Sequence, residues 1–478
     1  MKWVSSRGKS PAISFVDALF AGTAPDGGLY MPERLDPLPP GTLESLDGAD
    51  IVEIGTRIGS HLLRDEITPE ALRTLIADAL DFPIPLNQIT DRVSVLELFH
   101  GPTMAFKDVG ARVQARLLHH FTDGTPLTIL VATSGDTGSA VAQAFHRVPD
   151  TRVVVLYPEG QVSDVQEAQM ASLGDNVTAL AMRGTFDDCQ RLVKQAFADD
   201  DLRRHVWLTP ANSINLGRLL PQVFYYFVLA AGPVRRGAPI AGPPQSGPFT
   251  AGPDGPYIAA PAAASVLGTS ASLVEPGRSG ETVAPKEPPI VSVPSGNFGN
   301  LTAGLIAKRI GLPVRQFVAA TNVNDAVPEY LRSGRYEPRP SIRTVANAMD
   351  VGAPSNLERM QALYGGNLDA LRRDVVGFAY DDARIVAEIG DVYRRHGYLL
   401  DPHSAIAWLA LQDVLATEPS ARGVFVATAH PAKFREVVEP AIGKTVPLPP
   451  ALEEAITRPR HAISMNVDYE TLAAFLRG

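Results

Sequence analysis

The sequence predicts an α/β protein in which open parallel sheets carry helices on both faces. Three apolar segments, 127–132, 152–157 and 177–182, each precede a stretch with helical periodicity. Continuous apolar strands are typical of parallel sheets that are buried on both faces. Strands and helices that alternate at this spacing form right-handed βαβ units. With 478 residues, the chain is long enough for two or three domains.

Residues 1–92 are expected to form a compact, mostly helical lead-in. Apolar residues recur at helical spacing in three segments, Ser14–Phe20, Ile51–Leu63 and Pro69–Leu80. Thr68 is a suitable N-cap for the last of these. A short strand at 93–99 follows, and then a helix that contains Lys107, for which Thr103 is a candidate N-cap.

The remaining elements alternate in the same way. The helices expected after the first three strands are Ser139–His146, Ser163–Ser172 and Phe186–Ala198. One long apolar helix is expected at Leu216–Ala231. The sheet resumes with strands at Ile290–Val293, Arg315–Ala320 and Gly423–Ala427, and with helices at Leu301–Ile310, Ala383–Tyr393 and Ser404–Ala416. The tail, 435–478, is expected to be helical and irregular.

A proline-rich segment interrupts this pattern. Residues 232–289 hold 12 of the 41 prolines of the chain, together with many Gly, Ala and Ser residues. Such a composition cannot bury enough apolar surface to order itself. We therefore expect a flexible surface insertion between a helix and the next strand, where insertions are tolerated.

Charge and composition exclude several classes of function. A net charge of -9 argues against general binding to nucleic acids or anionic membranes. The single cysteine, Cys189, cannot form an intramolecular disulfide. No run of about 18 uncharged apolar residues predicts a transmembrane helix, and the first ten residues contain no apolar core of a signal peptide. A cytoplasmic protein is therefore expected. The histidines show no metal-ligand spacing, so no metal is assigned.

Lys107 is the first candidate for catalysis. It follows the apolar triplet Met104-Ala105-Phe106 and precedes Asp108. Apolar neighbours remove solvent from a lysine and favour its neutral, nucleophilic amine, which is the form that attacks an aldehyde. Most lysines nevertheless lie on solvated faces, so this pattern alone is weak.

Three loops that follow predicted strands carry further candidates. The loop Ser295–Asn300 joins a strand to a helix through two glycines, so its backbone N–H groups could converge on an anion. An ordinary strand-to-helix turn is at least as common. The loop Thr133–Gly138 offers hydroxyls for a carboxylate or phosphate, or simply an N-cap. Thr428 ends a strand, where its hydroxyl could bond a ring nitrogen.

Together these features match the needs of pyridoxal phosphate. This cofactor requires an amine for its aldehyde, a cradle for its phosphate and a partner for its pyridine nitrogen. Ligands of open α/β sheets bind at the carboxyl ends of the strands, where all three loops are predicted to lie.

The order of the motifs resembles the threonine synthase family, in its longer fungal and proteobacterial type. The resemblance covers nearly the whole chain. It is carried by Ser6-Arg-Gly8, Asp26-Gly-Gly-Leu-Tyr-Met-Pro32, His100-Gly-Pro-Thr-Met-Ala-Phe-Lys-Asp108, Thr133-Ser-Gly-Asp-Thr-Gly138, Asn212-Ser-Ile-Asn215, Gly296-Asn-Phe-Gly-Asn300, Thr321-Asn-Val-Asn-Asp325 and Ala429-His-Pro-Ala-Lys-Phe434. The proline-rich insertion lies outside the family pattern.

The resemblance implies a role for each motif. Lys107 would carry pyridoxal 5'-phosphate as an internal aldimine. The cofactor phosphate would lie on Gly296, Asn297, Phe298, Gly299 and Asn300, and Thr428 would face the pyridine nitrogen. The residues implied for substrate contacts are Thr133, Ser134, Asp136, Thr137, Asn212, Ser213 and Asn215.

The implied reaction converts O-phospho-L-homoserine and water into L-threonine and phosphate, the last step of threonine biosynthesis. The cofactor would be the electron sink and Lys107 the base at the α-carbon. Another enzyme of the same fold type, such as a threonine dehydratase or a phospho-amino-acid lyase, is the nearest alternative. A nucleotide-binding α/β protein is the least favoured alternative, because the sequence lacks the fingerprint motifs of that class. A monomer is implied, with no nucleic-acid or membrane partner.

The resemblance also implies two open parallel-sheet domains, the arrangement called fold type II among pyridoxal-phosphate enzymes. The expected divisions are an N-terminal domain at 1–92, a large cofactor-binding domain made of 93–127, 209–231 and 289–478, a smaller α/β domain at 128–208, and the low-complexity insertion at 232–288.

Overall fold

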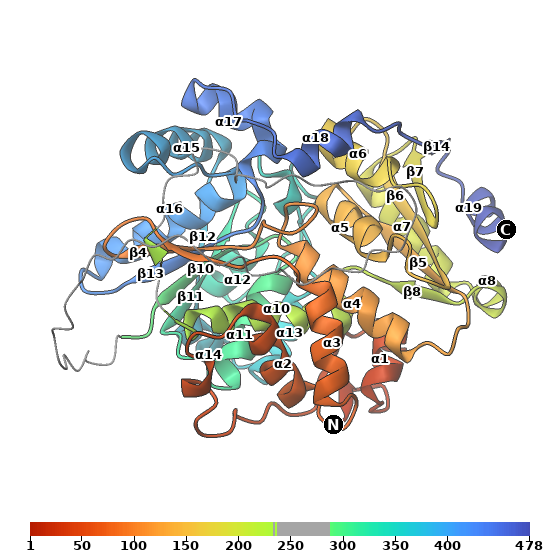
Figure 1. Cartoon of the computed structure of the whole chain (residues 1–478), viewed down its shortest axis with the longest axis horizontal. Coiled ribbons are helices and arrows are strands. Elements are labelled where there is room, and N and C mark those ends of the chain that lie inside the picture. The colour runs from red at the N-terminus through yellow and green to blue at the C-terminus, as the bar shows by residue number, and fades with distance from the viewer. Residues whose placement is uncertain (233–234, 237–286) are drawn as a thin grey trace, which may run out of the picture. The chain divides into compact units, whose positions relative to one another are not determined.

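The computed structural model describes residues 1–232, 235–236 and 287–478. The predicted insertion therefore lies almost wholly outside the described residues. Two sheets, one all-parallel and one mainly parallel, organise the described chain (Figure 1), and the sequence predicts parallel sheets. A short antiparallel pair near the start, β1 (Trp3–Ser5) and β2 (Tyr30–Pro32), forms a separate two-stranded sheet.

The larger sheet has seven strands. Their order across the sheet is β12 (Val375–Ala379), β11 (Gln316–Thr321), β10 (Ile290–Pro294), β13 (Gly423–Ala427), β4 (Val93–Glu97), β3 (Leu86–Gln88) and β9 (Arg235–Arg236). Neighbours from β12 to β4 are parallel, and β3 is antiparallel to β4. The carboxyl ends of β10, β11, β13 and β4 therefore meet at one edge.

The smaller sheet has five strands, all parallel. Their order is β14 (Ala462–Met465), β7 (Val177–Met182), β6 (Thr151–Pro158), β5 (Leu127–Ala132) and β8 (Leu208–Pro210). This sheet comes from the βαβ units that the apolar segments predict.

The helices form in three groups along the chain. The first group is α1 (Phe15–Ala21), α2 (Ile51–Leu62), α3 (Pro69–Ala79) and α4 (Lys107–Phe121). The second is α5 (Asp136–Phe145), α6 (Asp164–Ala171), α7 (Phe186–Ala198), α8 (Asp200–His205), α9 (Leu216–Leu219) and α10 (Pro221–Tyr226). The third is α11 (Gly299–Arg309), α12 (Ala326–Ser333), α13 (Leu357–Leu363), α14 (Leu368–Asp374), α15 (Asp382–His396), α16 (Pro402–Thr417), α17 (Arg435–Ile442), α18 (Pro450–Thr457) and α19 (Tyr469–Arg477).

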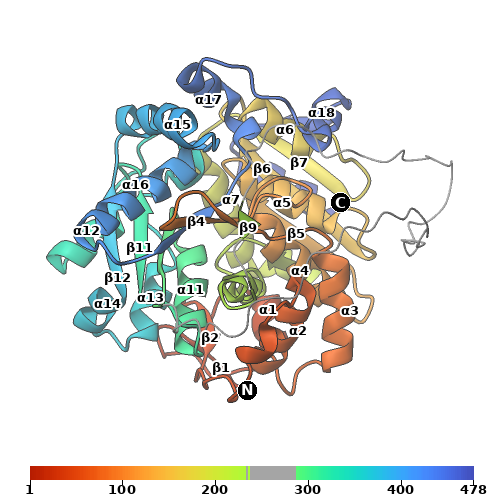
Figure 2. The ribbon, with the colours of Figure 1, turned by 60° about the vertical axis from the view of Figure 1, so that its left-hand side comes forward.

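Both faces of the larger sheet are covered. In β11, Phe317 and Ala319 belong to one apolar core, whereas Val318 and Ala320 belong to another. Successive side chains of a strand point to opposite faces, so each core lies against one face. Figures 1 and 2 show α15 and α16 on one side of this sheet and α11 and α13 on the other. The same alternation in β5 and β6 places α5 and α7 on opposite faces of the smaller sheet.

The prediction of one long helix at Leu216–Ala231 is wrong. The segment divides into α9, α10 and a 3₁₀ turn at Phe227–Leu229. Pro221 has no N–H to continue the hydrogen-bond ladder of α9, but it is suited to the first position of a new helix, which it occupies in α10.

β12 and β14, each at a sheet edge, are among the strands that the sequence does not predict. β14 lies in the tail predicted to be helical and irregular, and three of its four residues are exposed. β12 is also only partly buried. Neither therefore shows the continuous apolar pattern of a central strand. The predicted large domain includes 289–478, yet β14 pairs with β7 of the smaller sheet. The domain divisions remain a prediction.

Among the residues that the structure describes, no helix has both the length and the hydrophobicity needed to cross a bilayer. Cys189, in α7, is fully buried, and burial raises the pKa of its thiol to about 12. This thiol therefore stays protonated near neutral pH and is a poor nucleophile.

One glycine sets the approach of α4 to α9. A Cβ at Gly110 would lie 2.5 Å from the carbonyl oxygen of Arg218, a backbone atom that cannot rotate away. A Cβ at Gly55, in α2, would instead lie 3.1 Å from Phe224 Cδ2, in a side chain that can shift. Both glycines therefore lie inside a helix, but a Cβ would meet a backbone atom at Gly110 and a side-chain atom at Gly55.

We expect Gly110→Ala to lower the free energy of unfolding by about 1–3 kcal/mol through overpacking. Gly55→Ala is the control, and it should stay within about 1 kcal/mol of the unsubstituted protein because alanine favours a helix. Urea denaturation followed by circular dichroism measures both. Equal stability of the two variants would contradict the close approach of α4 and α9.

Candidate active site

Loops from both sheets enclose one cavity of about 940 Å³. Thr133 follows β5, Ser295 follows β10 and Thr428 follows β13, and all three line it. The cavity thus lies beyond the carboxyl ends of parallel strands, the usual ligand position in open α/β sheets. The three loops that the sequence singles out do converge.

Lys107 enters this cavity as the first residue of α4. The loop before it continues the pairing of β4 with β13. Leu98 N–H donates to the Ala427 carbonyl at 2.9 Å, Phe106 N–H to the Thr428 carbonyl at 2.8 Å, and His430 N–H to the Met104 carbonyl at 3.0 Å. These backbone bonds fix Lys107 and Thr428 relative to each other, although the two residues are 321 positions apart in the sequence.

Asp108 holds the same loop from inside. Its carboxylate accepts from the Thr103 hydroxyl at 2.6 Å and from the Thr103 N–H at 2.9 Å. The prediction that Thr103 caps the helix is therefore wrong, and Phe106 occupies the N-cap position. Met104 lies in the left-handed region with φ 56°, a strained conformation for a non-glycine residue that the surrounding bonds must maintain.

The Lys107 side chain is 15% exposed. Burial lowers its pKa. The Asp136 carboxylate, 3.8 Å from Lys107 Nζ, opposes this change, whereas the Lys433 and Arg218 cations add to it. The net direction favours the neutral amine, which is the nucleophilic form. The sequence predicts that Lys107 loses solvent, but only the folded structure shows that the cations Lys433 and Arg218 lie near it.

The loop Gly296–Asn300 has the properties of an anion cradle. None of its five backbone N–H groups has an acceptor among the described residues. A Cβ at Gly296 would lie 2.7 Å from Met349 Cα, so no side chain fits there. Phe298 adopts a left-handed φ of 61° at the N-cap of α11. The loop therefore directs free N–H groups toward the cavity at a helix N-terminus.

The two asparagines of this loop hold its shape. Asn297 Nδ2 donates to Ser213 Oγ at 2.6 Å. Asn300 Oδ1 accepts from the hydroxyls of Tyr225 and Tyr226, at 2.6 and 2.7 Å. Asn300 Nδ2 is buried and has no acceptor among the described residues, so it is available to a bound anion.

The loop Thr133–Gly138 divides its polar groups between structure and cavity. Thr133 Oγ1 accepts from the N–H groups of Gly135 and Gly138, at 2.9 and 2.8 Å, and so closes the first turn of α5. This helix begins at Asp136, three residues before the predicted start. Ser134 and Thr137 line the cavity, and their hydroxyls make no hydrogen bond with any described residue.

Asn212 and Ser213 line the cavity, but Asn215 does not. Asn215 Nδ2 donates to the carbonyls of Leu19 and Pro210, at 2.7 and 3.0 Å, and its Oδ1 accepts from Gly217 N–H at 2.8 Å. Its side chain is therefore committed to the N-cap of α9. All other residues predicted for cofactor or substrate contacts line the cavity.

The sequence interpretation misses several charged or titratable residues of the site, among them Arg218, Lys433 and His403. Arg218 is 2% exposed and lines the cavity, and it has no carboxylate within 4.0 Å among the described residues. Its Nε has no hydrogen-bond partner there either, and burial lowers its pKa to about 10. The sequence feature that could have identified Arg218 is its position three residues after Asn215, at the predicted start of a helix.

The other two are Lys433 and His403. Lys433 lies in the 3₁₀ turn η4 (Pro431–Phe434), with its Nζ 2.7 Å from Asp136 Oδ1. His403 lines the cavity, and its Nδ1 lies 2.5 Å from Asp401 Oδ2, while its buried Nε2 has no partner among the described residues. Both belong to polar clusters that form only in the folded chain.

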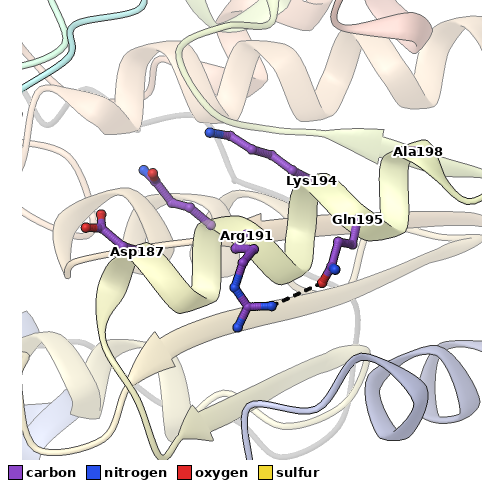
Figure 3. Close-up of a pocket in the computed structure, with 6 residues that line it drawn as sticks. Asp187, Arg191, Lys194, Gln195 and Ala198 are labelled. Atoms are coloured by element: carbon purple, nitrogen blue, oxygen red, sulfur yellow. Dashed lines mark hydrogen bonds between the residues drawn. The ribbon is translucent and has the colours of Figure 1, made fainter. Parts of the chain in front are cut away.

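A second pocket, of about 440 Å³, lies on the surface of α7 (Figure 3). Arg191 Nη1 donates to Gln195 Oε1 at 3.3 Å, and Lys194 leaves the helix in a different direction. Asp187 and Lys194 line the larger cavity as well. Because one helix lines this pocket, whereas Lys107 and three strand-end loops line the larger cavity, we assign the chemistry to the larger cavity.

The larger cavity fits pyridoxal phosphate. The Lys107 amine suits its aldehyde, and the N–H groups of Gly296–Asn300 suit its phosphate. The Thr428 hydroxyl, which makes no hydrogen bond with any described residue, suits its ring nitrogen. Among the described residues, no three His, Cys, Asp or Glu side chains are grouped as metal ligands would be.

Comparison with known proteins agrees with this geometry. Three family models match the chain: "Threonine synthase N terminus" over residues 2–80, "Pyridoxal-phosphate dependent enzyme" over 84–216, and "Threonine synthase, C-terminal" over 404–476. The threonine synthase of Escherichia coli (strain K12) is 39% identical over 472 residues, which cover 99% of this chain and 98% of that protein.

Two solved structures are similar over the full chain. The crystal structure of threonine synthase from Escherichia coli matches with a TM-score of 0.84 and 38% identity, covering 100% of this chain and 99% of that one. The structure of threonine synthase from Brucella melitensis, which contains pyridoxal phosphate, matches with a TM-score of 0.83 and 33% identity, with the same coverage. The chain is thus a pyridoxal-phosphate-dependent enzyme that belongs to the threonine synthase family.

Proposed function

We propose that the cavity around Lys107 converts O-phospho-L-homoserine and water into L-threonine and phosphate. The observation that carries the proposal is that one cavity holds two separate groups suited to anions, together with a desolvated amine. The N–H groups of Gly296–Asn300 form one, and the uncompensated guanidinium of Arg218 forms the other. The cofactor and this substrate each bring one phosphate.

The first anion group would hold the cofactor. Gly296, Asn297, Phe298, Gly299 and Asn300 would bind its phosphate through backbone N–H groups, and Lys107 would bond its aldehyde carbon. Thr428 would offer a neutral hydroxyl to the ring nitrogen. When bound, the cofactor withdraws electrons from bonds at the substrate α-carbon. A neutral partner at the ring nitrogen keeps that withdrawal weaker than a carboxylate would.

The second anion group would orient the substrate phosphate. Arg218 has both charge and a free Nε–H, and Asn212 and Ser213 line the same cavity. Ser134 and Thr137 would bind the substrate carboxylate through their unused hydroxyls. The remaining predicted residues support these contacts: Thr133 shapes the loop, Asp136 pairs with lysines, and Asn215 caps α9.

Lys107 would move the protons. Its side chain leaves the start of α4 and lines the cavity, and its pKa is lowered by burial. A neutral amine can accept a proton from one carbon and return it to the next on the same face, over one side-chain length. The phosphate then leaves from the γ-carbon, and water adds at the β-carbon.

The deciding experiment follows both products. Incubation with O-phospho-L-homoserine should release phosphate and L-threonine in equal amounts. Lys107→Ala should abolish the visible absorbance of the bound cofactor and reduce kcat by at least about 1,000-fold, because it removes both the attachment and the proton carrier. Phosphate release with 2-oxobutyrate as the organic product would indicate a lyase instead.

We expect Arg218→Met to lower kcat/KM for O-phospho-L-homoserine by about 10- to 100-fold, since one charge-assisted bond to the substrate phosphate is lost. Arg218→Lys should lose less. Arg339 lines the same cavity but pairs with Asp325, so Arg339→Met is the matched control and should change kcat/KM by less than about threefold. Steady-state kinetics compares the three variants. Equal losses in Arg218→Met and Arg339→Met would remove Arg218 from the substrate site.

We further propose that the chain acts as a monomer in the cytoplasm. Lys107, Arg218 and the loop Gly296–Asn300 line one cavity within a single copy of the chain. Light scattering of the purified protein should give a mass near 51.1 kDa. A mass of twice this value, unchanged on dilution, would indicate a stable dimer.

A further inference from the structure

A buried carboxylate lies between two lysines beside the cavity. Asp136, at the start of α5, has Oδ1 2.7 Å from Lys433 Nζ and Oδ2 3.8 Å from Lys107 Nζ. The Lys433 side chain is fully buried, and that of Asp136 is 3% exposed. Two ammonium groups and one carboxylate carry one net positive charge in a region with little water.

The carboxylate is committed to Lys433. The shorter distance makes a direct charged hydrogen bond with Lys433, whereas 3.8 Å to Lys107 is only an electrostatic contact. Burial alone would raise the pKa of Asp136, but Lys433 first and Lys107 second hold it well below its usual range. Gln166 Nε2 adds a second donor, at 3.1 Å.

Two other charged groups act on Lys107. Arg218, from α9, contributes a second positive charge, whereas the carboxylate of Asp108, on the same helix as Lys107, accepts two hydrogen bonds from Thr103 and opposes the lowering of the Lys107 pKa less than Asp136 does. Lys107 therefore faces two cations and two carboxylates, each of which already has another partner. Of the two lysines, Lys107 is the one with partial exposure, so it can exchange its proton.

Lys433 also touches the segment that carries Lys107. Its Nζ donates to the Thr103 carbonyl at 3.0 Å, and Thr103 in turn binds Asp108. One ammonium group thus joins η4, the start of α5 and the loop before α4. The same contacts fix its position.

We propose that Lys433 is a positioning residue for Lys107: by pairing with Asp136, it prevents this carboxylate from holding Lys107 as an ammonium ion. The inference rests on the proposed role of Lys107 as the amine of the reaction. A purely structural ion pair between Lys433 and Asp136 would leave the protonation of Lys107 unchanged, whereas the proposed role changes it.

The test uses charge-changing variants and two readouts. The first readout is the pH midpoint of the visible absorbance change in the cofactor-loaded protein. The second is the pH dependence with which acetic anhydride acetylates Lys107 in the cofactor-free protein, measured by peptide mass spectrometry. Lys444 is exposed and near the Tyr393 ring, so its acetylation serves as the internal control.

We expect Lys433→Met to raise both midpoints by about one to three pH units, because Asp136 is then left with Lys107 as its only cationic partner within 4.0 Å among the described residues. Lys433→Arg keeps the charge and should restore the midpoints. The double variant Lys433→Met with Asp136→Asn should also return them toward the original values. Asp136→Asn alone should lower them, since Lys433 then repels Lys107 without compensation.

These directions separate the proposal from simpler explanations. Unchanged midpoints in folded Lys433→Met protein would overturn it and leave Lys433 a structural residue. If Lys433→Met does not fold, Asp136→Asn replaces it as the test, and an unchanged or raised midpoint in that variant would also overturn the proposal. The acetylation readout needs neither cofactor nor turnover. A shift there, in a protein that makes no threonine, would refute the proposed function while supporting the role of Lys433.

Discussion

The pairing of two loops beyond the strand ends is the constraint on which the site depends. β4 and β13 are parallel neighbours, and their hydrogen bonds continue past both strands through Leu98, Phe106 and His430. Because this pairing is made by backbone groups, it is independent of the side chains that line the cavity. It places an amine at the start of a helix and a hydroxyl at the end of a strand in one fixed arrangement. Strain at Met104 is tolerated because bonds on both sides of it hold the loop.

The electrostatic character of the cavity follows from this frame. Lys107, Arg218 and Lys433 come from three different segments, and Asp136 is the one carboxylate within 4.0 Å of any of them in the described chain. The surroundings of Lys107 thus hold more positive than negative charge, although the whole chain has a net charge of -9. A local field of this kind draws anionic ligands into a protein that is acidic overall. It also favours an unprotonated amine, so the same charges serve binding and reactivity.

Much of the fold could be predicted from the sequence, because central strands of parallel sheets are apolar over their whole length. β5, β7 and β13 have the predicted bounds. Edge strands lack this pattern, and β12 and β14 were therefore not predicted. In the site, the loops that carry Lys107, Gly296 and Thr428 could be predicted from residue types and from the rule on strand ends. Arg218 and Lys433 could not, because their function depends on which partners the fold gives or denies them.

The position of β14 has a consequence for the order in which the chain can complete its fold. Residues 462–465 form the outer strand next to β7, whereas the other strands of that sheet lie between residues 127 and 210. During synthesis, the edge of β7 stays uncovered until more than 250 further residues have been made. An uncovered parallel edge can pair with another chain. The smaller sheet, although most of it emerges early, therefore depends on late residues for protection against aggregation.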